Sequence, residues 1–129
     1  MITRRIFLLA SATAGAGLAG FSIPAFASAY SDKAFDAAQA AGKSIILEFH
    51  ADWCPTCRAQ SPVVRSLLSS SYGGFEIFTV NYDSQKAVVK KFGVRRQSTL
   101  IVYKGNKEKG RAVGITSESA ISKLMAKAA

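Results

Sequence analysis

Both cysteines of the chain lie in the stretch Phe49-His50-Ala51-Asp52-Trp53-Cys54-Pro55-Thr56-Cys57-Arg58-Ala59-Gln60-Ser61-Pro62, which gives the strongest indication of the fold. The apolar run just before it predicts a buried strand over residues 44–50. After it, apolar residues at helical spacing, ending at Gly73-Gly74, predict a helix over residues 54–71. The two cysteines therefore lie where a strand passes into a helix.

This position gives the cysteine pair its chemistry. The free backbone N–H groups and the dipole at a helix N-terminus favour an anion, and a thiolate on Cys54 would be that anion. We expect Cys54, as the better-exposed cysteine, to attack a substrate disulfide, and the more buried Cys57 to resolve the mixed disulfide. A fixed disulfide or half of a zinc site are alternatives, although zinc needs four ligands and the chain adds only His50.

The motif Trp53-Cys54-Pro55-Thr56-Cys57, with Pro62 five residues after the second cysteine, resembles the thioredoxin family. The resemblance continues through residues 80–83, 91–95 and 98–105 and through Gly114, and it covers about residues 31–128. It implies an α/β, thioredoxin-like fold with a central mixed four-stranded sheet flanked by helices on both faces. It also implies a protein-disulfide oxidoreductase, with no cofactor.

The remaining elements follow from capping residues and apolar spacing. Ser31 caps a first helix so close to the start of the expected domain that the family's extra N-terminal strand is predicted to be missing. We expect a strand over residues 75–80 and then a helix capped by Asp83 or Ser84. A hairpin is expected to pair residues 100–103 with 112–115, before a last helix that starts near Ser117 and buries Ile121, Leu124 and Met125.

Two strand residues bear on proton transfer. The resemblance places a buried carboxylate at Glu48, where it would take the proton of Cys57. The family's lysine partner for that carboxylate would fall at Thr79, so we expect this ion pair to be absent and Glu48 to be hard to ionise. His50 shares strand parity with Glu48; it either shuttles protons or is a partly exposed histidine without a chemical role.

Ser98 departs from the family pattern, which has a cis-proline at this position. A non-proline cis bond costs about 2.5–4 kcal/mol, so we expect Ser98 to be trans. The loss of proline opens space beside Cys54, and this supports an alternative: a metal- or iron–sulfur-binding protein with Cys54 and Cys57 as ligands. The residues expected to contact substrate are Trp53, Pro55, Thr56, Gln97, Ser98 and Thr99.

The N-terminal segment predicts export. Thr3-Arg4-Arg5-Ile6-Phe7-Leu8 resembles a twin-arginine signal, and an apolar stretch then leads to the small-x-small site Ala25-Phe26-Ala27. We expect a signal peptide over residues 1–27, cleaved after Ala27, and a thioredoxin-like domain over residues 28–129. The alternative is an uncleaved membrane anchor, because residues 6–27 carry no charge and are nearly long enough to span a bilayer.

The net charge and the predicted export together limit which kinds of partner are expected. The chain has 129 residues, enough for one domain, and a formal net charge of +9, which suits acidic or anionic partners. Arg95 and Arg96 could form a basic rim, but no basic run alternates with aromatics as in a nucleic-acid site. We therefore predict a monomeric periplasmic oxidoreductase that acts on cysteine pairs of exported proteins. Reduction is preferred over oxidation, with electrons from a membrane donor, although the neutral Pro55-Thr56 leaves the direction open.

Overall fold

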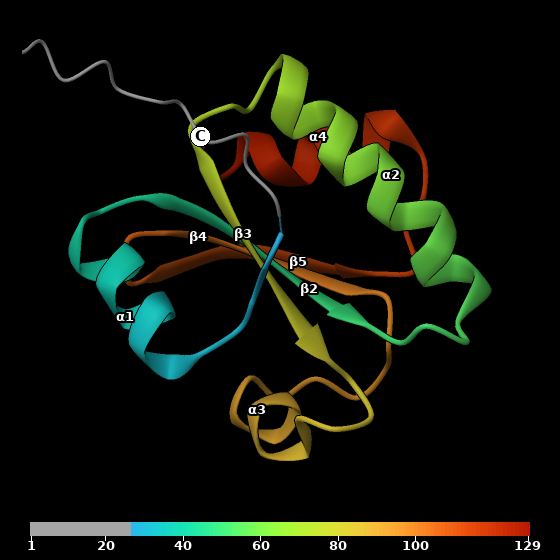
Figure 1. Ribbon diagram of the computed structural model, residues 1–129. Coiled ribbons are helices and arrows are strands. Elements are labelled where there is room, and N and C mark those ends of the chain that lie inside the picture. The colour runs from blue at the N-terminus through green and yellow to red at the C-terminus, as the bar shows by residue number, and fades with distance from the viewer. Residues whose placement is uncertain (1–26) are drawn as a thin grey trace, which may run out of the picture.

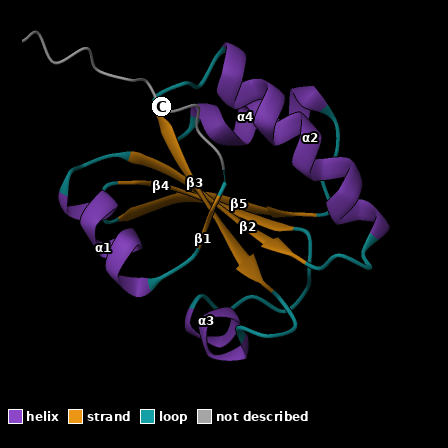
Figure 2. Cartoon of the chain, viewed as in Figure 1, coloured by secondary structure: helices purple, strands orange, loops and turns teal. Residues whose placement is uncertain are grey.

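Strand β2 (Ser44–His50) lies at the centre of the sheet and leads directly into the cysteine loop and helix α2 (Pro55–Ser70). The protein is described here by a computed structural model, over residues 27–129. Figure 2 shows the helices outside a twisted sheet. The other elements are β1 (Ser28–Ala29), α1 (Asp32–Ala40), β3 (Phe75–Asn81), α3 (Lys86–Lys91), β4 (Thr99–Lys104), β5 (Lys107–Val113) and α4 (Glu118–Ala126).

The sheet is mixed, with the strand order β1-β3-β2-β4-β5. Strand β2 runs parallel to β3 and antiparallel to β4, and β5 pairs with β4 as an antiparallel hairpin. The parallel β2–β3 connection passes through α2, as a parallel pair requires. In this register Glu48 of β2 lies opposite Thr79 of β3 and Leu100 of β4.

Each face of the sheet has its own core, set by the alternation of side chains along β2. Ile45, Leu47 and Phe49 join the core that α1 and α3 cover, whereas Ile46 joins the core beneath α2 and α4. Figure 1 shows these two helix pairs on opposite sides of the sheet. A fully buried side chain of this size contributes about 1.5–3 kcal/mol, so both layers are held mainly by apolar burial. Glu48 lies two residues after Ile46, so its side chain points to the same face of the sheet, toward α2.

Several predicted elements are confirmed. Strand β2 has the predicted bounds, and α2 lies within one residue of the predicted range. The hydroxyls of Ser31 and Ser117 accept hydrogen bonds from backbone N–H groups three residues on, so they cap α1 and α4 as expected. Such a cap contributes about 1 kcal/mol. The residues predicted to be buried in α4, namely Ile121, Leu124 and Met125, all lie in the core.

The prediction of four strands, with no N-terminal strand, is wrong. Ser28 and Ala29 form a fifth, two-residue strand that pairs in parallel with Phe78 and Thr79 of β3. The Tyr30 N–H donates to the Thr79 carbonyl at 2.9 Å and extends this contact. Both strand residues are exposed, so their pairing depends on backbone hydrogen bonds and leaves no apolar pattern in the sequence.

Two boundaries were also predicted wrongly. The second hairpin strand spans Lys107–Val113 rather than residues 112–115, because this edge strand is mostly exposed and gives no alternating apolar signal. Helix α3 has Gln85 at its N-cap position, without a side-chain capping hydrogen bond, rather than Asp83 or Ser84. The reason is that the Asn81 side-chain oxygen accepts from the N–H groups of both of these residues and holds them in a turn before the helix.

The predicted signal peptide or anchor lies almost entirely outside the described residues. Within residues 27–129, no helix combines the length and apolar character needed to cross a membrane.

Candidate active site

The first turn of α2 places both cysteines at the end of β2. Cys54 is the N-cap residue, and its sulfur accepts a hydrogen bond from the Cys57 N–H at 3.2 Å. Pro55 occupies the first helical turn, where its missing N–H is not needed and its fixed φ suits the helix. The sequence thus builds the capped helix N-terminus that was expected, with the sulfur of Cys54 as the capping group.

The two cysteines are free thiols, and both are buried. Cys54 is 2% exposed and Cys57 is 1% exposed, so exposure does not distinguish them as predicted. Their difference lies in hydrogen bonding. The Cys57 thiol lies 3.9 Å from the Phe49 carbonyl, a contact in which it is the donor, whereas Cys54 receives the backbone N–H at the helix start.

The two pKa values move in opposite directions. Burial opposes ionisation of Cys54, but hydrogen bonds from the Cys57 thiol, the Ser98 hydroxyl and the N–H groups of Cys57 and Thr56 outweigh it and lower its pKa. Burial, followed by the hydrogen bond to Cys54, raises the pKa of Cys57. This split is the one a nucleophile and a resolving thiol require.

Ser98 lies directly over the dithiol. Its hydroxyl oxygen is 3.4 Å from each of the two sulfurs, and its side chain is buried. The peptide bond before Ser98 is trans, as predicted, but φ is +62°, a left-handed conformation that costs a non-glycine residue about 1–2 kcal/mol. The hydroxyl therefore occupies the side of the dithiol that loss of the proline was expected to leave open.

Backbone and side-chain hydrogen bonds hold Ser98 in this conformation. Its N–H donates to the Phe49 carbonyl at 2.9 Å, and its carbonyl accepts from the Gly114 N–H at 3.0 Å. The Gln60 side-chain nitrogen donates to the same carbonyl at 3.1 Å and to the Ile115 carbonyl at 2.8 Å. Gln60 is fully buried, and it is not among the site residues predicted from the sequence. An amide at a core-facing position of the predicted helix could have indicated a buried polar residue with a structural role.

The residues around the dithiol do not favour the metal-binding alternative. Across residues 27–129, no group of three or more histidine, cysteine or acidic side chains is arranged to hold a metal ion. Cys54 and Cys57 therefore lack further ligands within the described part of the chain, and the Ser98 hydroxyl contacts both sulfurs. A mononuclear zinc or iron site needs four ligands, which this arrangement does not supply.

Glu48 is buried beneath α2 and is held by three donors. Its carboxylate accepts from the hydroxyl of Ser61 at 3.2 Å, from the guanidinium of Arg65 at 3.2 Å and from the hydroxyl of Thr79 at 2.8 Å. The lysine ion pair of the family is absent, as expected, yet Glu48 does have an ion-pair partner. Thr79 does replace the family's lysine, but Arg65 supplies the positive charge from the facing helix.

Helical periodicity explains how these groups meet. Cys57, Ser61 and Arg65 are spaced four residues apart, so they lie along one face of α2, with about 5–6 Å between successive Cβ atoms. Glu48 contacts the second and third of these residues. Its carboxylate thus contacts the residue one helical turn after Cys57, and its role as a base stays a prediction.

The predicted substrate residues divide by exposure. Trp53 is 58% exposed, and its indole N–H donates to Asp83 at 2.8 Å. Pro55 is also exposed, whereas Thr56 and Gln97 are half-buried. Thr99 is buried, and its hydroxyl donates to the Arg96 carbonyl, so its side chain faces inward. These substrate roles stay predictions.

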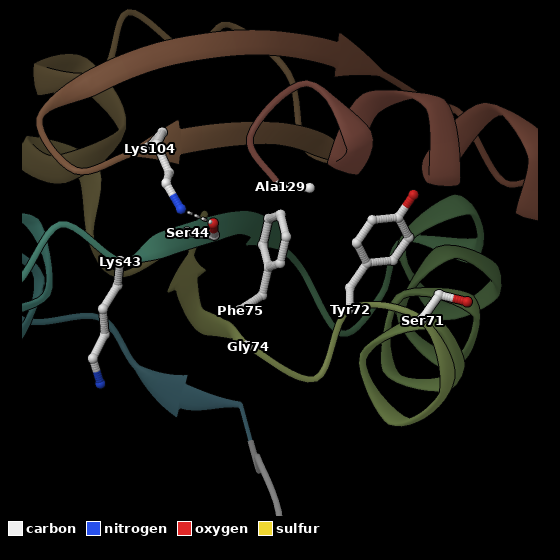
Figure 3. Close-up of a pocket in the computed structure, with 8 residues that line it drawn as sticks. All are labelled: Lys43, Ser44, Ser71, Tyr72, Gly74, Phe75, Lys104 and Ala129. Atoms are coloured by element: carbon white, nitrogen blue, oxygen red, sulfur yellow. Dashed lines mark hydrogen bonds between the residues drawn. The ribbon is translucent and has the colours of Figure 1, made fainter.

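A separate hollow lies at the other end of β2, away from the dithiol. Figure 3 shows Tyr72 and Phe75 beside Ser44, whose hydroxyl receives a hydrogen bond from Lys104 at 3.2 Å. The pocket has a volume of about 330 Å³. It is lined by residues at the start of β2, while Cys54 follows the end of that strand. This hollow takes no part in the thiol chemistry.

This chain is similar to known proteins in sequence and in fold. A family model described as Thioredoxin matches residues 27–127. Thioredoxin H4 from Arabidopsis thaliana is 30% identical over 90 residues, which are 70% of this chain and 76% of that protein. Thioredoxin M4 of Arabidopsis chloroplasts is 28% identical over 81 residues, which are 63% of this chain and only 42% of that longer protein. The crystal structure of Trxlp from Edwardsiella tarda matches with 40% identity and a TM-score of 0.75, and the match covers 78% of this chain and 98% of that one. The chain belongs to the thioredoxin family of thiol–disulfide oxidoreductases.

Proposed function

We propose that this protein reduces disulfides of exported proteins in the cell envelope, with Cys54 as the nucleophile and Cys57 as the resolving thiol. The observation that carries the proposal is the place of Cys54 as the N-cap of α2, where its sulfur accepts the Cys57 N–H at 3.2 Å, whereas the Cys57 thiol donates to the Phe49 carbonyl. The lowered pKa of Cys54 and the raised pKa of Cys57 agree with this geometry. A thiolate attacks disulfides and a thiol does not, so the first of these residues is prepared to start the reaction.

The reaction has two exchange steps. The Cys54 thiolate attacks one sulfur of the substrate disulfide, forms a mixed disulfide and releases the other substrate sulfur as a thiolate, which takes up a proton. Cys57 then gives its proton to Glu48 and attacks the sulfur of Cys54. This releases the second substrate thiolate and leaves a Cys54–Cys57 disulfide. Two electrons pass to the substrate, and a dithiol donor at the membrane restores the reduced pair.

Trapping of the mixed disulfide tests the two cysteine roles. Cys57→Ser should accumulate a covalent complex with substrate, because attack can occur and resolution cannot. Cys54→Ser is the matched control and should accumulate little. Non-reducing electrophoresis with mass spectrometry of the linked peptides measures both. Equal trapping by the two variants would contradict the assignment.

The direction of electron flow is set by the reduction potential. Hydrogen bonds that stabilise the Cys54 thiolate also stabilise the reduced dithiol, and this makes the pair more oxidising. The Ser98 hydroxyl supplies such a contact, so the potential should lie above that of ordinary thioredoxins, which is about −270 mV. Equilibration with glutathione gives the value. A potential near the −120 mV of the strongest oxidants would replace reduction by oxidation in this proposal.

The envelope location is motivated by Arg4-Arg5 and by the site Ala25-Phe26-Ala27. Replacement of both arginines by lysine should keep the protein in the cytoplasm, and the exported form should begin at Ser28. Cell fractionation and N-terminal sequencing measure these outcomes. A processed protein that still begins at Met1 would favour the anchor over the cleaved signal.

The surface around the dithiol suits acidic substrate segments. Trp53 and Val113 are the two exposed large apolar side chains of residues 27–129, and Val113 pairs with Thr99 directly after Ser98. Arg95 and Arg96 line a pocket of about 250 Å³ together with Val113. Changing both arginines to glutamine should raise KM for a peptide disulfide flanked by aspartates and leave kcat unchanged. An equal effect on a peptide flanked by lysines would contradict this preference.

A further inference from the structure

We propose that Ser61 and His50 form a proton relay that connects Glu48 to solvent. The inference rests on the proposed function, because it requires Glu48 to take up the proton of Cys57. Both residues act through Glu48, and within residues 27–129 neither forms a hydrogen bond to a cysteine sulfur, so they position and pass on a proton. From the sequence, the role of His50 stays open between proton transfer and no chemical role, and no sequence pattern points to Ser61.

A continuous chain of contacts leads from the buried carboxylate to the surface. The Ser61 hydroxyl donates to Glu48 Oε2 at 3.2 Å and lies 3.4 Å from His50 Nδ1. On the other side of the ring, His50 Nε2 lies 3.2 Å from Asp52 Oδ1. The Asp52 side chain is 99% exposed, so the chain of contacts ends in water.

Glu48 needs such a route because its side chain is only 2% exposed. Of its three hydrogen-bond donors, the Arg65 guanidinium does not release a proton in proteins. The Thr79 hydroxyl contacts no further titratable group through a hydrogen bond in the described chain. Ser61 is the donor that leads on to an imidazole, the side chain best suited to exchange protons near neutral pH.

A hollow in the surface brings solvent to the end of this relay. His50, Asp52 and Arg65 line a pocket of about 360 Å³, and its other lining residues are Ala27, Ala29, Thr79, Asn81 and Gln85. The His50 side chain is 22% exposed, whereas Ser61 is buried. The charged groups that face the ring are thus Glu48 through Ser61, Arg65 from α2 and Asp52 from the loop after β2.

The proton balance closes without an added reactant. When Cys57 attacks, its proton passes to Glu48, which becomes neutral. Glu48 then gives a proton to the Ser61 oxygen as the Ser61 hydroxyl proton moves to Nδ1 of a neutral His50. The resulting imidazolium is stabilised by the Asp52 carboxylate and releases its Nε2 proton to water. His50 is then neutral with its proton on Nδ1. When the donor reduces the Cys54–Cys57 disulfide, the transfers run in reverse: Glu48 passes a proton to the Cys57 thiolate and regains one from Ser61, Ser61 regains one from Nδ1, and water protonates Nε2, which restores every group.

The test is single-turnover resolution of a preformed mixed disulfide on Cys54, followed at low buffer concentration. His50→Gln and Ser61→Ala should each slow resolution by about tenfold or more, since a positioned acid or base contributes about 100- to 10,000-fold. Added imidazole should restore the rate of His50→Gln in proportion to its concentration, while the wild-type rate does not respond. Ser66→Ala, at an exposed position of the same helix, is the matched control and should behave as wild type.

The outcomes separate this relay from the proposed function. If Glu48→Gln is slow but His50→Gln resolves at the wild-type rate, the relay is wrong and the base role of Glu48 stands. If His50→Gln is slow and imidazole does not restore it, His50 acts only structurally and the relay is again wrong. If Glu48→Gln resolves normally, the step assigned to Glu48 under the proposed function fails. Circular dichroism of each variant confirms that the fold is intact.

Discussion

Removal of the Ser98 hydroxyl should raise the pKa of Cys54. The Ser98→Ala substitution deletes an oxygen that lies 3.4 Å from both sulfurs and keeps the buried backbone in place. The hydroxyl has one proton, which it donates to the Cys54 thiolate when that thiolate forms. Its loss leaves the backbone N–H groups of Thr56 and Cys57 and the Cys57 thiol to stabilise the anion.

The size of the effect follows from the energy of one hydrogen bond to a charged group. Such a bond contributes about 1.5–3 kcal/mol, and the long contact distance favours the lower end. At about 1.4 kcal/mol per pKa unit, the pKa of Cys54 should rise by about one unit. The thiolate fraction at neutral pH then falls by at most about tenfold, the limit that applies when the pKa lies above 7. Each remaining thiolate becomes about threefold more nucleophilic, so the attack rate should fall by at most about threefold.

The assay is the pH dependence of Cys54 alkylation by iodoacetamide in a Cys57→Ser background, compared with and without the Ser98 substitution. Ser98→Gly is the matched variant, because it also lacks the hydroxyl but is unstrained at a φ of +62°. Both variants should show the same higher midpoint, while Ser98→Gly should be more stable than Ser98→Ala by about 1 kcal/mol. An unchanged midpoint in both variants would show that the Ser98 hydroxyl does not stabilise the Cys54 thiolate. Different midpoints would assign the effect to the backbone instead of the hydroxyl.

Three further substitutions test the surroundings of the site and the core. Ser98→Pro should destabilise the protein by about 3 kcal/mol in urea unfolding, because proline cannot adopt the observed φ and loses the N–H bond to Phe49; wild-type stability would contradict this. Gln60→Leu should lower the free energy of unfolding by about 1–3 kcal/mol, since the Ile115 carbonyl loses the Gln60 donor, and it should shift the Cys54 alkylation midpoint as Ser98 is released. If neither the stability nor the midpoint changes, Gln60 does not hold the loop. Burial, and then the hydrogen bond to Asp32, raise the pKa of Tyr30 from 10.0 to about 12. The neutral Tyr30 therefore contributes about 2–3 kcal/mol to the free energy of unfolding below pH 10, and this contribution is lost between pH 10 and 12. Tyr30→Phe should remove that decline from alkaline unfolding curves, and an unaltered decline would exclude Tyr30 as its source.

The family, the central strand and the place of the dithiol could all be predicted from local patterns in the sequence. Strand Ser44–His50 and the helix after it were predictable because their apolar residues follow regular periods and their ends carry capping signals. These signals are local, since each depends on residues within about two turns or one strand. The expected trans bond before Ser98 also followed from a local rule, the high energy of a non-proline cis peptide.

The groups that surround the dithiol come from distant parts of the chain and could not be predicted from local patterns. Ser98 is 44 residues from Cys54 along the chain, yet its hydroxyl contacts both sulfurs through a left-handed backbone that no pattern in the sequence indicates. Arg65 pairs with Glu48 from the facing helix, so the charge missing at Thr79 comes from a different element. Strand β1 likewise exists because its backbone meets the edge of β3. Contacts of this kind depend on where the packed layers bring distant residues together, which local periodicity and capping do not specify.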